Sequence, residues 1–301
     1  MWALQFSEYG DPDVISLGEA PEPHAGPGQI RIVVKAASVN PVDWKTRSGF
    51  YAQGKPLEGT GYLGFDAAGV VDEVGEGVTG VAVGDEVSGL GSKTHAEYAV
   101  LNSWAHKHPS VDWAVAAAAG IVAETAERTL RLLGVGPGST LFIDGGAGGV
   151  GSAATQFAIA RGATVIASAS EDNQGYLREI RAIPVLYGPG VVDRVRATGK
   201  KVDAVLDTAG KTPVEDLIAI APEPSQLLSI ANFGAAAAGA QVTGGGADSQ
   251  PMAALAQAAE LLKESKLVIK VQTFPFSRAA EAHELLQNGH VRGKLVLIPE
   301  H

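Results

Sequence analysis

The chain has 301 residues, of which 46% are hydrophobic and 19% charged, so it is long enough for about two domains and is not a single small module. Its 23 Lys and Arg against 33 Asp and Glu give a net charge of −10, which disfavours nucleic acid and anionic membranes as partners. The absence of cysteine excludes disulfides, thiolate metal sites and cysteine nucleophiles.

The N-terminus carries no sign of a targeting segment. Its first Lys or Arg is Arg31, so no basic region precedes an apolar run, and we expect no signal peptide. The longest apolar run, Ala114–Ala123, is about half of the ~20 residues that a membrane-spanning helix needs. We therefore expect a cytoplasmic protein without membrane insertion.

The first third of the chain consists of short segments with the pattern of β-strands. Hydrophobic residues alternate over Trp2–Phe6 and Ala96–Val100, while Ile30–Val39 and Ala67–Val74 are rich in β-branched and small apolar residues. Turn residues recur between these segments. Residues 1–118 are predicted to form a small β-barrel domain.

After Gly120 the pattern changes to alternating helices and strands. Helices are predicted over Ile121–Leu133 and Val150–Arg161, and strands over Ser139–Ile143, Thr164–Ala167 and Ala204–Leu206. Further expectations are strands over Gln226–Ile230 and Leu267–Val271, a helix over Met252–Lys263, and a loop over the Ala- and Gly-rich Gly234–Gly246. This alternation is typical of an α/β domain with a doubly wound parallel sheet, over residues 119–270.

The last segment, residues 271–301, changes character again. Ser277 is predicted to cap a helix that Asn288-Gly289 ends, and a strand is predicted over Lys294–Ile298. We expect this segment to return to the first domain.

The strongest chemical signal is a glycine-rich loop directly behind the strand Ser139–Ile143. Gly146, Gly148 and Gly151 fit the pattern G-x-G-x-x-G, and a helix with an apolar face follows. Such glycines let the backbone approach a pyrophosphate at the positive end of the helix. The sequence therefore predicts a dinucleotide site that includes Gly149 and Val150; the alternative is a glycine turn in another kind of α/β protein.

The end of the next strand indicates which dinucleotide is bound. A carboxylate there would hold the ribose 2′-hydroxyl of NAD and repel the 2′-phosphate of NADP. The strand ends instead in Ser168 and Ser170, which favours NADP. Glu171 and Asp172 follow at once, close to where a ribose-binding acid is expected by counting from the loop, so NAD stays open at this point.

Four motifs in order along the chain resemble those of the medium-chain dehydrogenase/reductases, and within them the zinc-free quinone oxidoreductases. They are Ala37–Lys45 (ASVNPVDWK), Gly64–Val71 (GFDAAGVV), Gly145–Gly151 (GGAGGVG) and Gly289–Lys294 (GHVRGK). The resemblance implies a GroES-like substrate domain, closed by the C-terminal segment, and a Rossmann cofactor-binding domain. It also implies a homodimer that transfers hydride from NADPH to a quinone or an α,β-unsaturated carbonyl without zinc.

The resemblance further implies roles for individual residues. Asn40 matches a position near the nicotinamide and the substrate, and Thr125 matches a threonine at the nicotinamide end. The other matched positions are Ser170, Asn173 and Tyr187 around the 2′-phosphate, Ile230 and Asn232 beside the nicotinamide ring, and the basic Lys294 near the cofactor. Each has a plainer structural alternative: Asn40 ties a loop, Tyr187 is a rim aromatic, and Lys294 is a solvated charge.

The chain also departs from the family pattern. Asp172 stands where NADP-using relatives commonly have a lysine, and Arg181 replaces a usual glycine. The zinc ligands of other family members have no counterpart, because Gly64-Phe65-Asp66 stands there. His106 and His108 lack a third ligand nearby, so no metal site is predicted.

Two residues are candidates for the proton donor, with an ordered water as the third possibility. Tyr51 stands where the related zinc-free enoyl-thioester reductases carry a tyrosine acid, and Asn40 is the second candidate. Tyr51 and Lys55 also match Y-x-x-x-K, but Gly54 and Pro56 would break the helix that this motif requires. The alternative functions are an enoyl-thioester reductase, an NAD-dependent enzyme of the alcohol dehydrogenase type, and a non-enzymatic NADPH-binding protein.

Overall fold

The computed structural model describes residues 1–289 and 291–300, and its contacts divide the chain into two compact units. Unit 1 combines residues 1–121, 251–264 and 269–301, and unit 2 combines residues 122–250 and 265–268. The division falls inside helix α2 (Trp113–Leu132). His290 of the fourth family motif lies outside the described residues.

Unit 1 contains a closed barrel of four antiparallel strands. β3 (Ile30–Val39) pairs with β5 (Asp66–Val74) on one side and with β7 (Tyr98–His106) on the other, and β6 (Glu86–Ser92) joins β5 to β7. Its interior holds apolar side chains such as those of Ile32 and Leu101. The predicted barrel is confirmed, with β6 as an additional strand.

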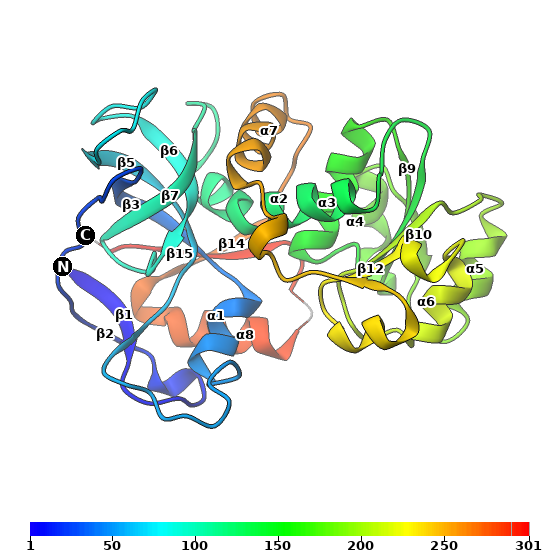
Figure 1. The fold of residues 1–301 in the computed structure, drawn as a ribbon, viewed down its shortest axis with the longest axis horizontal. Coiled ribbons are helices and arrows are strands. Elements are labelled where there is room, and N and C mark those ends of the chain that lie inside the picture. The colour runs from blue at the N-terminus through cyan, green and yellow to red at the C-terminus, as the bar shows by residue number, and fades with distance from the viewer. Residues whose placement is uncertain (290, 301) are drawn as a thin grey trace. The chain divides into compact units, whose positions relative to one another are not determined.

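The chain termini add to the barrel. β1 (Trp2–Phe6) lies between β2 (Ser16–Glu19) and β4 (Gly61–Tyr62) in a small sheet. At the other end of the chain, β15 (Lys294–Ile298) pairs with β3 and with β14 (Val271–Pro275). Helices α1 (Pro41–Arg47) and α8 (Ala279–Asn288), far apart in sequence, lie side by side (Figure 1).

Two expectations for this region were wrong. No strand covers Leu267–Lys270, because the backbone N–H and carbonyl of Val268 bond the side-chain amide of Gln156 instead of a neighbouring strand. Ser277 does not cap α8: it lies inside a 3-10 turn, and its N–H and hydroxyl donate to the carboxylate of Glu300.

Helix α7 (Pro251–Lys263) lies in unit 1, although the sequence places these residues in the domain 119–270. It packs against β7, and the N–H of Trp104 lies 3.3 Å from the sulfur of Met252. The helix buries Ala254, Leu255 and their neighbours on its apolar face. Its partner strand lies some 150 residues earlier, and the local pattern does not reveal that contact.

Unit 2 is built on a six-stranded parallel sheet of order β10-β9-β8-β11-β12-β13. The strands are β8 (Thr140–Asp144), β9 (Thr164–Ala169), β10 (Ile183–Leu186), β11 (Ala204–Asp207), β12 (Leu227–Ser229) and β13 (Gln241–Val242). The order reverses beside β8, and in doubly wound sheets ligands bind at the carboxyl ends of the strands at this point. The predicted Rossmann sheet is confirmed.

The helices of unit 2 join successive strands. They are α2, α3 (Gly149–Ala160), α4 (Gln174–Glu179), α5 (Val191–Ala197) and α6 (Val214–Ile220), and α5 packs beside α6 (Figure 1). The remaining short elements are 3-10 turns over Pro12–Val14, Glu171–Asn173, Pro224–Gln226, Phe233–Ala238, Gly246–Asp248 and Phe276–Arg278.

Two expectations for the α/β part need correction. Helix α2 begins at Trp113 rather than Ile121, because the carboxylate of Asp112 accepts from the N–H of Ala114 and the alanine-rich run propagates the helix. The expected loop Gly234–Gly246 contains β13, since Gln241 pairs with Leu228 of β12. Within the described residues, no helix is both long and apolar enough to cross a membrane.

Substituting Gly69 by alanine is expected to destabilise the barrel. A Cβ at Gly69 would lie 2.2 Å from the carbonyl oxygen of Val33 on the paired strand, so β3 and β5 must separate. Such overpacking costs about 1–3 kcal/mol in the free energy of unfolding. Thermal denaturation of Gly69→Ala measures the loss. Gly136→Ala, where an added Cβ meets no atom within 4 Å, is the control, and equal melting temperatures would contradict the prediction.

Candidate functional site

The glycine loop after β8 closes so tightly that two of its positions exclude a side chain. Gly145 has a φ of +85°, in the left-handed region. A Cβ on Gly151 would lie 2.2 Å from the carbonyl oxygen of Gly145, and one on Gly146 would lie 2.6 Å from the Cβ of Ala167. Glycine at these positions thus lets α3 begin directly against the end of β8.

The second glycine of the motif, Gly148, leaves open space at the helix end. Gly148 is the N-cap of α3, and a Cβ there would meet only the carbonyl oxygen of Gly145, at 3.5 Å. The next two residues, Gly149 and Val150, begin the helix, where the first backbone N–H groups have no carbonyl partner in the helix itself. This arrangement suits an anionic group such as a pyrophosphate.

A buried carboxylate supports the loop from below. The Ser168 hydroxyl donates to Asp144 at the end of β8 and accepts from the N–H of Gly145 at 3.1 Å. Burial raises the pKa of Asp144, and the nearby charge of Asp207 acts in the same direction. Because Ser168 is 0% exposed and fully engaged here, the structure corrects its expected role: it holds the loop and does not face a 2′-phosphate.

The turns after β9 and β10 bring three other predicted residues together. Ala169 and Leu186 are in register at the ends of these strands, so Ser170 and Tyr187 follow at neighbouring positions. The amide of Asn173 donates to the Ser170 hydroxyl at 3.0 Å, and Tyr187 is half exposed. Hydroxyl, amide and phenol groups therefore gather at one edge of the sheet.

Gln174 ties these two turns to each other. Its side-chain N–H groups lie within 3.0–3.2 Å of the carbonyl oxygens of Ala169, Ser170 and Val185. Glu171 and Asp172 lie beyond the strand tip on an exposed 3-10 turn. No carboxylate therefore occupies the tip of β9, where an NAD-binding acid would stand.

A second buried carboxylate organises the ends of β11 and β12. Asp207 accepts from the N–H of Gly210 and the hydroxyl of Ser229, each at 2.7 Å. The N–H of Ile230 donates to the Asp207 carbonyl, and the N–H of Asn232 donates to the Ser229 hydroxyl at 2.8 Å. The predicted stretch beside the nicotinamide is therefore held at the same carboxyl edge. We did not predict Asp207, although an acid at the end of a buried parallel strand was a usable signal.

Thr125 belongs to a buried polar network on α2. Glu124 and Arg128 form an ion pair at 2.8 Å, and Arg128 also donates to the Thr243 hydroxyl at 2.7 Å. Arg128 lies 3.5 Å from the Thr125 hydroxyl. This network ties α2 to the segment after β13 within unit 2.

In unit 1, Asn40 is the centre of a buried cluster. Its amide N–H groups donate to Asp66 at 2.7 Å and to the Ser38 hydroxyl at 3.2 Å, and its carbonyl oxygen accepts from the ammonium of Lys294. The side chain is 1% exposed. Since both of its polar atoms have partners inside unit 1, the structure favours a loop-tying role for Asn40 over direct proton donation.

The partners of Asn40 are themselves buried and charged. Lys294 is 5% exposed, which corrects the alternative of a solvated charge; burial lowers its pKa, while Asp66 and Asp43 act in the opposite direction. Asp43 accepts from the backbone N–H groups of Asn40 and Gly64, and burial raises its pKa. These contacts hold α1 against the Gly64-Phe65-Asp66 turn.

Tyr51 differs from Asn40 in being accessible. It is 56% exposed in a turn segment after α1, and its ring meets that of Phe50 edge-on at 5.2 Å. Partial burial raises its pKa above the ordinary value, so the phenol is protonated at neutral pH. The segment from Tyr51 to Lys55 is not helical, which agrees with setting the Y-x-x-x-K match aside.

The histidines form no metal cluster in the part of the chain that the structure describes. His106 and His108 are partnered by the carbonyl of Gly80 and the hydroxyl of Ser110, and both are exposed or nearly so. His283 is buried in unit 1, where burial lowers its pKa well below the ordinary value. Among the described residues, no three His, Asp or Glu side chains are placed to hold a metal ion.

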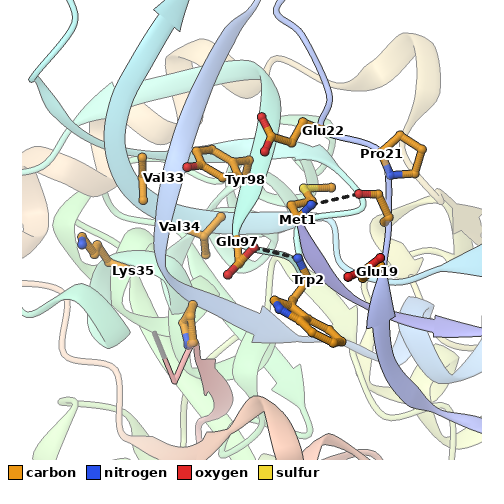
Figure 2. Close-up of a pocket in the computed structure, with 12 residues that line it drawn as sticks. Met1, Trp2, Glu19, Pro21, Glu22, Val33, Val34, Lys35, Glu97 and Tyr98 are labelled. Carbon is orange, nitrogen blue, oxygen red and sulfur yellow. Dashed lines mark hydrogen bonds between the residues drawn. The ribbon is translucent and has the colours of Figure 1, made fainter.

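A pocket of about 870 Å³ lies elsewhere in unit 1 (Figure 2). It is lined by residues of the N-terminal strands and of β3 and β7, among them Trp2, Glu22 and Tyr98. The N–H of Trp2 donates to Glu97 at 2.7 Å across it. None of the predicted site residues lines this pocket, so we place the candidate site at the polar clusters described above.

Comparisons with known proteins agree with the fold of each unit. Residues 26–132 match the family model of the alcohol dehydrogenase GroES-like domain, and residues 186–297 match that of zinc-binding dehydrogenases. The first match confirms that the barrel of unit 1 is GroES-like.

Individual relatives match along almost the whole chain. The NADPH-dependent alkenal/one oxidoreductase of Arabidopsis thaliana chloroplasts is 30% identical over 99% of this chain and 80% of its own length. The human quinone oxidoreductase is also 30% identical, over 99% and 98% of the two chains. The solved quinone oxidoreductase from Coxiella burnetii superposes with a TM-score of 0.84 at 33% identity, over 99% of both chains. The chain therefore belongs to the quinone oxidoreductases of the medium-chain dehydrogenase/reductase superfamily.

Proposed function

We propose that the protein is an NADPH-dependent oxidoreductase that delivers hydride to a quinone or an α,β-unsaturated carbonyl without zinc. In this proposal unit 2, residues 122–250 with 265–268, binds the cofactor, and unit 1 binds the substrate. The observation that carries it is the carboxyl edge of the parallel sheet, which carries the open end of α3 and the Ser170, Asn173 and Tyr187 side chains. The relatives, an NADPH-dependent alkenal/one oxidoreductase and a quinone oxidoreductase by name, support the same reaction.

The residues present fit a dinucleotide. Space in front of Gly148 and the N–H groups of Gly149 and Val150 would hold the pyrophosphate, and Tyr187 with the Ser170 turn would hold the 2′-phosphate. Ile230 and Asn232, fixed by Asp207 and Ser229, would line the nicotinamide end together with Thr125. When bound, the cofactor supplies the hydride.

What the protein must add is a proton donor for the carbonyl oxygen that becomes negative as hydride arrives. Tyr51 is protonated and accessible, whereas Asn40 is buried and fully bonded. We therefore assign the donor to Tyr51, with an ordered water as the alternative. Lys45, Arg47 and Lys55 lie near Tyr51 in the chain and would favour an anionic acyl thioester as substrate. Arg47, however, is buried and donates to Gln287, so only Lys45 and Lys55 are accessible and support for such a substrate is weaker. The homodimer and the cytoplasmic location stay predictions.

The cofactor assignment predicts that NADPH binds more tightly than NADH. The tip of β9 carries Ser170, whose hydroxyl can donate to the 2′-phosphate, and the carboxylates of Glu171 and Asp172 come only after it. Titration of both nucleotides, followed by nucleotide fluorescence, measures the two dissociation constants. Equal affinities or a preference for NADH would show that Glu171 or Asp172 holds the ribose.

The metal-free assignment predicts that exhaustive chelation leaves turnover unchanged and that the purified protein carries no stoichiometric zinc. The reason is that the chain has no cysteine and that its described histidines lack companion ligands. Metal analysis and assays before and after chelation test this. A loss of activity that added zinc restores would overturn it.

The donor assignment predicts that Tyr51→Phe lowers turnover by about 10²–10⁴-fold with little change in NADPH affinity, because the substitution removes the hydroxyl and keeps the ring. Steady-state assays with a panel of quinones and enones measure the effect. Tyr98→Phe is the matched control, since the Tyr98 ring lies in the pocket of Figure 2, beneath Arg31. A fall of less than about threefold would transfer the role to water. If the wild-type protein reduces none of these compounds, the result would favour the alternative of a non-enzymatic NADPH-binding protein.

A further inference from the structure

The turn between β10 and α5 is wrapped around one side chain, that of Arg194. Its Nε donates to the carbonyl of Leu186 at 2.8 Å and its Nη1 to that of Pro189 at 3.0 Å. Its Nη2 donates to the carbonyls of Tyr187 and Gly188, at 3.1 and 2.9 Å. Four of the five guanidinium N–H groups thus bond consecutive carbonyls of the turn that carries Tyr187.

These four contacts fix the orientation of the peptide groups. The carbonyl and N–H of a trans peptide point in opposite directions, so carbonyls drawn toward Arg194 turn the following N–H groups away from it. One of these N–H groups, that of Tyr187, donates to the carbonyl of Ala169 on β9 at 3.2 Å. Those of Gly188 and Gly190 likewise point away from the guanidinium. Both glycines have positive φ, 86° and 81°, a conformation that other residues adopt only with strain.

The charge of Arg194 matters because of its neighbours in the predicted 2′-phosphate subsite. Glu171 and Asp172 stand on the adjacent turn after β9, and their charges oppose a phosphate. An arginine stays ionised in any protein environment, so its bonds to the carbonyls of the turn are always charge-assisted.

We propose that Arg194 is a positioning residue for NADPH selectivity: by gathering the carbonyls of residues 186–189, it holds Tyr187 and the N–H groups of the turn toward the 2′-phosphate. The proposal rests on the proposed NADPH site and adds to it the residue that shapes its adenosine end. Arg194 acts through the turn and does not itself touch the cofactor.

The test compares ligands with and without the 2′-phosphate. The variants are Arg194→Gln, which removes the charge and most donors, and Arg194→Lys, which keeps the charge but cannot span four carbonyls. Arg196→Gln is the matched control, because Arg196 lies on the same helix and donates to the carbonyl of Ala219 on α6, at 3.4 Å. Dissociation constants are measured for NADPH and NADH. They are also measured for 2′,5′-ADP and 5′-AMP, whose binding can be followed without any enzymatic activity.

We expect Arg194→Gln to raise the dissociation constants of NADPH and 2′,5′-ADP by about tenfold, which is typical of losing charge-assisted contacts. The dissociation constants of NADH and 5′-AMP should rise by less than about twofold. Arg194→Lys should lose nearly as much of the preference for ligands with a 2′-phosphate. Arg196→Gln should lose none of it. Melting temperatures of all variants establish that they are folded, and Arg194→Lys replaces Arg194→Gln if the latter does not fold.

Other outcomes overturn the proposal in distinguishable ways. Equal weakening of all four ligands would mean that Arg194 only stabilises the sheet edge. Full selectivity in Arg194→Lys would mean that charge at a distance, and not the ordering of the turn, sets the preference. If the wild-type protein itself binds 5′-AMP and NADH as well as their 2′-phosphorylated counterparts, the proposed cofactor fails and this role of Arg194 fails with it.

Discussion

The close approach of Gly151 to the carbonyl oxygen of Gly145 is the constraint on which the arrangement of unit 2 depends. An added Cβ would lie 2.2 Å from that oxygen, so α3 can start against β8 only because the position is glycine. The approach places the first N–H groups of α3 at the point where the strand order reverses. Asp144 and Ser168 then hold the loop from the interior, through bonds that a solvent-facing serine would not make.

The carboxyl ends of the neighbouring strands are likewise held by side chains that bond the backbone. A backbone that leaves a parallel sheet has polar groups without strand partners, and burying them unpaired is costly. Asp207, Gln174 and Arg194 supply these partners at β11, β9 and β10. Asp207 accepts hydrogen bonds from the backbone, and Gln174 and Arg194 donate hydrogen bonds to it. These bonds fix the turns that carry the residues of the proposed site. The same turns therefore carry both these structural bonds and the residues of the proposed cofactor site.

In unit 1, the residues that hold the fold together differ from the residue that we propose as the proton donor. The buried Asn40 bonds both Asp66 and Lys294, and Asp43 bonds the N–H of Gly64, so α1, the Gly64 turn and β15 are held together. A group that is already fully bonded in the interior cannot offer a proton to substrate without breaking those bonds, which is why we propose the accessible phenol of Tyr51 as the donor instead. The buried ammonium of Lys294 is balanced by the carboxylates of Asp66 and Asp43.

The sequence by itself determined the features that depend on local pattern. The strand Ile30–Val39, the strands that became β8 and β9, and the glycine loop could be read directly, because strand periodicity and glycine spacing are properties of a few consecutive residues. The four family motifs extended this to the GroES-like and Rossmann assignment. What only the tertiary structure decided are the partners of polar side chains. Ser168 meets Asp144 across 24 residues and Asn40 meets Lys294 across 254. The unit to which α7 belongs was decided in the same way, by a contact 148 residues away along the chain. A hydroxyl or an amide looks alike in the sequence whether it faces a ligand or the interior, since its hydrogen-bond partner comes from another element that only the fold brings near.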